Sequence, residues 1–355
     1  MNSNEISQKQ IVFITIFFLL GNSLSKGYNY YMGASSYFLN LICIPIALLF
    51  AAVLFKILKT FPQKNIFQIF DICLGKRLSQ IITLVFTVIS VFLASESLFN
   101  GAGFVKASML PKSPFWFIVL LSAVFCAYVS CHKNSIVGRF AVTSVPVLLL
   151  LIFISLLLAT KSYDFSNLKI SGISLENASM GVFHGVCSPY GELFFLSVLF
   201  SRYDGSHKGF KACFLGIAAA GIILSLIYLR NLLLLSEYVL TRTPFSSNLA
   251  MSVTNAGEYL RRFEVILSSA YVVLDLFKAS CFVLFALRGI SHLFENKRPS
   301  RYFLPISAAT YLLTVLMSIF QKEFSDFFAL KSLFLSPLVL IFPIVLLLLS
   351  KRKKS

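Results

Sequence analysis

The chain has 355 residues, of which 57% are hydrophobic, 15% aromatic and only 13% charged. Soluble globular domains carry about 25% charged residues, so this composition excludes that class and predicts an integral membrane protein. The net charge of +17 does not indicate nucleic-acid binding, because the basic residues follow the alternation of loops between apolar segments.

Ten apolar segments are each close to the roughly 20 residues that a membrane-spanning helix requires. They are predicted at residues 9–31, 35–58, 80–105, 115–132, 138–160, 177–200, 209–236, 260–290, 302–320 and 331–350. Lys and Arg gather in the loops on the side that carries both termini, which predicts that both termini are cytoplasmic. The basic tail at residues 351–355 would then lie beside anionic membrane lipid.

The first and the sixth segments are interrupted by small and helix-breaking residues. Paired interruptions in corresponding positions of two halves are typical of a transporter-type binding site near the membrane midplane. The alternative is that they are only packing features, since Gly and Pro are common in membrane helices. The interruptions are Gly21, Asn22 and Ser23 in the first segment, and Gly185, Cys187, Ser188, Pro189 and Gly191 in the sixth.

These positions divide one membrane domain into two repeats of five helices, residues 9–160 and 177–350. Because five is odd, the second repeat enters the membrane from the opposite side, so an inverted repeat with helices 1 and 6 broken is predicted. Freed backbone groups at a break must find partners in a cavity or a ligand. A zwitterionic amino acid offers a charge for each end of a broken helix.

Ionisable residues inside predicted membrane helices are expensive and are functional candidates. Glu96, Glu192, Arg230, Asp275 and Lys278 are in this class. Asp275 and Lys278 are three positions apart on one helix face, a spacing that allows them to neutralise each other. A structural ion pair and a coupling role are the two alternatives for them. Glu192 follows the second interruption and is a candidate for proton or ion coupling, and Glu96 is suggested as the partner of Arg230.

Two segments between the spans have amphipathic character. Residues 62–77 are predicted to form a short cytoplasmic helix, and residues 238–264 a helix start in the outer interface that is either an extracellular gate or a solvated face. A disulfide framework, a metal site and a cofactor are not indicated, because the seven Cys and four His are scattered. An enzyme is not expected, because His184, Cys187 and Ser188 lack an oriented set of base and acid.

Five short motifs stand in a fixed order along the chain. They are Ile6-Ser7-Gln8-Lys9-Gln10, Leu74-Gly75-Lys76, Leu110-Pro111-Lys112-Ser113-Pro114, Gly191-Glu192 and Arg262-Phe263-Glu264. In this order they resemble the spore germination B-subunit family, the permease-like membrane subunit of the nutrient germinant receptor, within the amino acid/polyamine/organocation (APC) transporter superfamily. The resemblance covers essentially the whole chain.

The resemblance implies a ten-helix fold in the spore inner membrane and assembly with an A subunit and a C-subunit lipoprotein. It implies a sensor that binds an amino acid or a similar small germinant, with a proton-coupled amino acid permease as the alternative and a scaffold without a ligand as a third possibility. The implied ligand-binding residues are Gly21, Asn22, Ser23, Ser95, Gly185, Cys187, Ser188, Ser268 and Ser269.

Overall fold

The structure, a computed structural model of the chain, describes residues 6–29, 31–168, 175–200, 207–254, 258–296 and 298–352. Every regular element within these ranges is helical. Eight helical segments are long and apolar enough to cross a membrane, and two shorter apolar helices, Gln8–Leu20 and Phe115–Ser130, accompany them. The all-α membrane protein predicted from the composition is confirmed.

The helices follow one another with short connections. In chain order they are α1 (Gln8–Leu20), α2 (Ser23–Lys26), α3 (Ser36–Thr60), α4 (Ile66–Leu74), α5 (Lys76–Ser108), α6 (Phe115–Ser130), α7 (Asn134–Ala159), α8 (Leu175–Gly185), α9 (Ser197–Phe200), α10 (His207–Arg242), α11 (Ser246–Val253), α12 (Glu258–Leu293), α13 (Phe303–Ile319), α14 (Gln321–Ser336) and α15 (Phe342–Arg352). Between them lie the short elements η1 (Gly33–Ser35), η2 (Thr160–Ser162), η3 (Phe165–Asn167), η4 (Val186–Tyr190), η5 (Gly191–Leu196), η6 (Pro299–Tyr302) and η7 (Pro337–Ile341).

Two of the predicted spans lie at the centre of the bundle. They are the interrupted sixth span and the eighth span, which carries Asp275 and Lys278. Within the most apolar 18-residue window of each segment, 83% of the residues are buried in Leu175–Phe200 and 78% in Phe263–Leu293. The corresponding share in Pro299–Ile319 is 22%. The peripheral helices α3, α6, α7 and α13 instead expose large apolar side chains such as Leu49, Val124 and Leu312. Exposed apolar surface of this kind faces lipid in a membrane protein.

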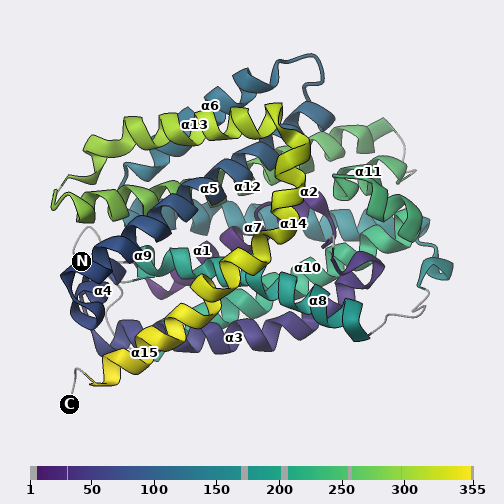
Figure 1. Cartoon of the computed structure of the whole chain (residues 1–355). Helices are drawn as coiled ribbons and strands as arrows, with labels where there is room; N and C mark the ends of the chain where they lie inside the picture. Colours follow the sequence, from purple (N-terminus) through teal and green to yellow (C-terminus); the bar gives the residue numbers. More distant parts are fainter. Residues whose placement is uncertain are drawn as a thin grey trace.

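The predicted cytoplasmic helix within residues 62–77 is present as α4. Asn65 and Gln68 form a capping box at its start, each side chain accepting from the backbone N–H of the other. Its apolar face is packed inward, with Phe67 against Phe285 at 5.0 Å and Phe70 against Phe86 at 5.8 Å between ring centroids. In Figure 1, α4 and the C-terminal end of α15 lie at one end of the bundle, and α2 and α11 lie toward the other.

The last predicted span differs from the structure at its start. The sequence pattern places it from residue 331, whereas α14 already begins at Gln321 and runs to Ser336 before the π-helical turn η7. Gln, Lys and Glu are good helix formers, so the charged residues that marked a loop in the hydropathy pattern are part of a helix. The side chains of the basic tail, residues 351–355, lie outside the described residues.

Candidate functional site

The first interruption separates α1 from α2 at Gly21 and Asn22. Gly21 has extended backbone angles (φ −56°, ψ 139°) and Asn22 has a left-handed conformation (φ 60°, ψ −26°). A Cβ atom on Gly21 would lie 2.9 Å from Cβ of Lys278 and 3.0 Å from the carbonyl oxygen of Leu274. The absence of a side chain therefore lets the end of α1 lie directly against α12.

The second interruption follows α8, which ends at Gly185. The π-helical turn η4 comes next, and inside it Ser188 has non-helical backbone angles (φ −144°, ψ 118°). The chain then continues as the 3₁₀ helix η5, which carries Glu192. Irregular helical geometry of this kind at membrane depth is tolerated where it is buried in protein or lines a cavity.

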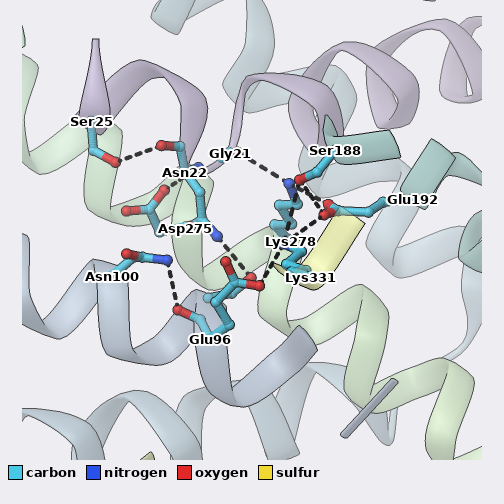
Figure 2. Close-up of polar contacts among 11 residues, drawn as sticks. Gly21, Asn22, Ser25, Glu96, Asn100, Ser188, Glu192, Asp275, Lys278 and Lys331 are labelled. Carbon is cyan, nitrogen blue, oxygen red and sulfur yellow. Dashed lines mark hydrogen bonds and ion pairs between the residues drawn. The ribbon is translucent and has the colours of Figure 1, made fainter. Parts of the chain in front are cut away.

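Two charged side chains of α12 satisfy the backbone groups on either side of the first interruption (Figure 2). The N–H of Asn22 donates to Oδ1 of Asp275 at 2.5 Å, and Nζ of Lys278 donates to the carbonyl of Gly21 at 3.4 Å. An anion at the start of a helix and a cation at the end of one are favoured by the helix dipole. α12 thus supplies a carboxylate to the α2 side and an ammonium to the α1 side.

Of the two alternatives for Asp275 and Lys278, the structural ion pair between them is not formed. Lys278 forms its ion pair with Glu192, with 2.8 Å between Nζ and Oε2, and Asp275 instead accepts the Asn22 hydrogen bond. The reason lies in the break itself, because it exposes an amide and a carbonyl that each attract one of the two charges.

The ion pair of Lys278 continues into a buried network of alternating charge (Figure 2). Nζ of Lys331, from α14, lies 3.1 Å from Oε1 of Glu192 and 2.6 Å from Oε2 of Glu96. Ser188 at the second interruption donates to Oε1 of Glu192 at 2.5 Å. Pairing of this kind offsets the cost of holding charges in a medium of low dielectric constant. The network connects α5, η5, α12 and α14.

The suggested pairing of Glu96 with Arg230 is also wrong. Glu96 pairs with Lys331, and Arg230 donates to Asn231, Ser155 and Met251. Sequence reasoning placed Lys331 at the outer edge of the last span and missed its role. A lone Lys preceded by Phe-Phe-Ala-Leu and followed by Ser-Leu-Phe-Leu was the signal that could have revealed it as an intramembrane charge.

Two buried acceptors beside the first interruption have no hydrogen-bond donor among the described residues. They are Oδ2 of Asp275 and Oδ1 of Asn22. The other ends of both side chains are occupied, since Asp275 Oδ1 accepts from the Asn22 backbone and Asn22 Nδ2 donates to Ser97 at 2.9 Å. The nearby hydroxyl of Ser25 donates instead to the Asn22 carbonyl at 3.2 Å. Buried acceptors without a partner are uncommon in folded proteins, and each requires an explanation.

The remaining residues of the predicted ligand site are divided between the interruptions and more distant places. Ser23 lies next to Tyr228 of α10, and Gly185 and Cys187 lie beside Cys43 of α3. Ser23 is therefore a neighbour of α10, and Gly185 and Cys187 are neighbours of α3.

Three predicted ligand residues make contacts of their own away from the charged network. Ser95 donates to Thr310 in α13 at 3.2 Å, and Ser268 donates to Asn248 in α11 at 2.8 Å. Ser269 is exposed and donates within its own helix, to Val265 at 2.8 Å. The structure therefore brings Gly21, Asn22 and Ser188 together with the charged residues but does not bring in Ser95, Ser268 or Ser269.

His184 has partners other than the neighbours considered in the sequence. Its Nδ1 is hydrogen-bonded to the Ser332 hydroxyl, and its ring stacks on Tyr31 at 3.5 Å between centroids. Within the described ranges, three or more His, Cys, Asp or Glu side chains do not come together as a metal-binding group.

The fold is shared with solved membrane transporters. A manganese transporter of Eremococcus coleocola superposes with a TM-score of 0.65 at 15% identity, over 98% of this chain and 78% of the transporter. Mhp1, a nucleobase-cation-symport-1 family transporter, gives a TM-score of 0.61 at 13% identity over 90% and 74%. MhsT in complex with L-phenylalanine gives 0.59 at 13% identity over 88% and 80%. The helical bundle thus has the fold of these solved membrane proteins.

The sequence itself has relatives in spore germination. Spore germination protein KB of Bacillus subtilis (strain 168) is 22% identical over 364 residues, which cover 100% of this chain and 97% of that protein. The family model described as spore germination protein matches residues 5–324. The chain therefore belongs to the spore germination protein family of permease-like membrane proteins.

Proposed function

We propose that this chain is the B subunit of a nutrient germinant receptor, and that it binds the ammonium group of a small nutrient at the interruption between α1 and α2. Family membership supports the germination role, and the likeness to secondary transporters supports a small-molecule site in the bundle. Because MhsT, which shares the fold, is in complex with L-phenylalanine, an amino acid is the first class of nutrient to test.

One observation carries the location of the site. Asp275 Oδ2 and Asn22 Oδ1 are buried acceptors without donors among the described residues, and the 2.5 Å hydrogen bond from the Asn22 backbone N–H to Asp275 Oδ1 holds the two residues together. An ammonium group has three donors and no acceptor, so it satisfies both oxygens at once. Its positive charge also compensates the carboxylate, which has no ion-pair partner among the described residues.

The finer architecture belongs to the same proposal. The chain would have ten spans in two inverted sets of five, with the first and sixth spans broken and both termini in the cytoplasm. It would lie in the spore inner membrane and assemble with an A subunit and a C-subunit lipoprotein. Nutrient binding would shift the population of permease-like states, and the partners would respond to that shift.

A proton-coupled amino acid permease is the second candidate, and one observation favours it. A buried carboxylate with one oxygen free of donors, as in Asp275, can hold a proton when no cation is near. Purified protein in liposomes distinguishes the two functions. Accumulation of a labelled amino acid driven by a pH gradient supports the permease, whereas saturable binding without accumulation supports the sensor.

The proposal is tested by thermal unfolding of the purified full-length protein with each of the twenty L-amino acids. At least one is expected to raise the melting temperature, and Asp275→Asn is expected to abolish that shift while the protein remains folded. Asp164→Asn is the matched control, because Asp164 is an exposed capping residue that accepts from Ser166 at 2.9 Å. If Asp275→Asn retains the full shift, the ammonium site is elsewhere.

A further inference from the structure

Arg230 of α10 is a fully buried cation with no carboxylate partner in the described part of the chain. Its side chain is among the largest in the protein that are sealed from solvent, with 1% exposed. The ion pairs of the described residues do not include it. Burying a charge without a counter-ion costs much more than burying a paired one. This guanidinium therefore lies in an environment that favours an anion.

The present partners of the guanidinium are neutral. Asn231 Oδ1 accepts from Nε at 3.0 Å and from Nη2 at 2.6 Å, and Ser155 Oγ accepts from Nη1 at 3.0 Å. The remaining contact of Nη1 is with the thioether sulfur of Met251 at 3.5 Å. A thioether is a weak acceptor, and a carboxylate in its place forms a charge-assisted hydrogen bond about twice as strong as a neutral one.

A second group beside Arg230 lacks a partner of normal hydrogen-bond geometry. The hydroxyl of Tyr271, on α12, lies within electrostatic reach of the guanidinium. It makes no well-formed hydrogen bond to the described residues, and its side chain is 1% exposed. A buried phenol hydroxyl that lacks a well-formed hydrogen bond is costly. An anion bound to Arg230 can accept the Tyr271 hydrogen bond as well.

Tyr271 lies one helical turn from Asp275 on the same face of α12. Four residues correspond to about 6 Å along a helix axis, a span short enough for one small ligand to contact side chains from both turns. Asn231, which holds the guanidinium, also donates to the Gly27 carbonyl at the end of α2 at 2.8 Å. The cationic group and the unpaired carboxylate thus flank the same short helix.

The backbone groups at the two ends of the break are already hydrogen-bonded, so a ligand carboxylate does not find a free donor there. The N–H at the start of α2 already donates to Asp275, and the carbonyl at the end of α1 already accepts from Lys278. A negatively charged ligand group must therefore find its partner elsewhere, and Arg230 is a buried cation whose described partners are all neutral.

We propose that Arg230 and Tyr271 form the carboxylate site of the nutrient, so that a zwitterionic amino acid lies along α12 with its carboxylate at this site and its ammonium at Asp275. Met251 of α11 yields its place on the guanidinium to the carboxylate. The assignment rests on the proposed function for the ammonium end, while the anion site can be tested by itself.

The first test uses sodium acetate as the probe, with sodium chloride at equal ionic strength as the reference. In thermal unfolding of the purified full-length protein, acetate is expected to stabilise the wild type more than chloride does. Arg230→Met and Tyr271→Phe are expected to remove this difference. Arg242→Met is the control, because Arg242 lies exposed on the same helix, over the ring of Tyr238.

Tyr271→Phe keeps the test decisive if Arg230→Met does not fold. Its hydroxyl makes no well-formed hydrogen bond within the described part of the chain, so a purely structural role predicts that the variant is as stable as the wild type and responds equally to acetate. An equal acetate response in both proteins, or stabilisation of the wild type by chloride alone, overturns the proposal.

The second test compares the amino acid that binds best with the amine that lacks only its carboxyl group. The wild type is expected to bind the amino acid about ten- to a hundredfold more tightly than the amine, as for a hydrogen bond to a charged group. Arg230→Lys is expected to lower this ratio of the two dissociation constants. If an amino acid binds and the ratio is the same in the variant, the carboxylate site is wrong and the ammonium site stands. If no amino acid binds, while acetate stabilises the wild type and this effect is lost in Tyr271→Phe, the proposed function is wrong and the anion site stands.

Discussion

The backbone N–H of Asn22 donates to Oδ1 of Asp275 at 2.5 Å, across 253 positions of the sequence. This contact joins the start of α2 to the middle of α12, and Lys278 on the next turn of α12 reaches the carbonyl of Gly21. The interruption between α1 and α2 is therefore held open by one helix that provides a charge for each of its ends. A movement of α12 relative to α1 must break or remake these two contacts.

The close approach at Gly21 gives the first prediction. A Cβ atom there would lie 2.9 Å from Cβ of Lys278 and 3.0 Å from the Leu274 carbonyl, so Gly21→Ala and more strongly Gly21→Leu displace α1 from α12. The expected result is a normal amount of protein in the membrane and a loss of the ligand-induced melting shift. Gly103→Ala is the control, because its Cβ meets only Phe245 at an ordinary 3.5 Å. An unchanged shift in Gly21→Leu would argue against a site at this break.

The pair of Glu96 and Lys331 gives the second prediction. The Nζ–Oε2 distance is 2.6 Å, and both side chains are about nine-tenths buried. Removing one partner of a buried pair costs about 3 to 5 kcal/mol, so Lys331→Met and Glu96→Gln should each lower the melting temperature and the amount of protein recovered.

The double variant Glu96→Gln/Lys331→Met serves as the control for this pair. It leaves Lys278 and Glu192 as a neutral pair at 2.8 Å, so its stability should return close to that of the wild type. If the double variant is as unstable as the sum of the single variants, the two residues do not compensate each other's charge.

Sodium dependence gives the third prediction. In transporters with broken helices, unwound carbonyls often coordinate the coupling cation, but here the ammonium of Lys278 already occupies the carbonyl of Gly21. Ligand-induced melting shifts should therefore be equal in sodium chloride and in choline chloride. Lys278→Ala frees the Gly21 carbonyl and one oxygen of Glu192, and sodium should then stabilise the variant. A wild-type ligand shift that requires sodium contradicts this role of Lys278.

The orientation of the chain gives the fourth prediction. Single cysteines are placed at two exposed positions, Lys64 between α3 and α4 and Ser252 on α11, after the exposed Cys131 is replaced by Ser. A membrane-impermeant thiol reagent should label Ser252→Cys in intact cells and Lys64→Cys only after the cells are opened. The reverse pattern would place both termini outside.

Much of the fold could be predicted from the sequence because hydropathy and helix-breaking residues act locally. The apolar runs placed α3, α6 and α13 within a few residues of their observed ends, and Gly21 and Gly185 marked the places where α1 and α8 end. The charged start of α14 could not be recognised in this way, since a helix with Lys and Glu is indistinguishable from a polar loop on a hydropathy scale.

The site could be predicted only in part, because partners depend on packing between distant segments. The sequence identified Glu96, Glu192, Asp275 and Lys278 as buried charges, and all four are buried. Their pairing could not be obtained from spacing along α12, since Lys278 finds its partner in η5. Nothing in the sequence distinguished Tyr271 from the other aromatic residues, because it is singled out only by its place next to Arg230 and by the lack of a well-formed hydrogen bond to its hydroxyl among the described residues.

The most direct test of the account is an experimental structure of the full-length protein with the amino acid that raises its melting temperature most. The account predicts that the ligand ammonium lies within hydrogen-bonding distance, about 2.7 to 3.2 Å, of Asp275 Oδ2 and Asn22 Oδ1. A bound amino acid whose ammonium contacts other residues, with both of these oxygens still lacking a donor, would contradict it.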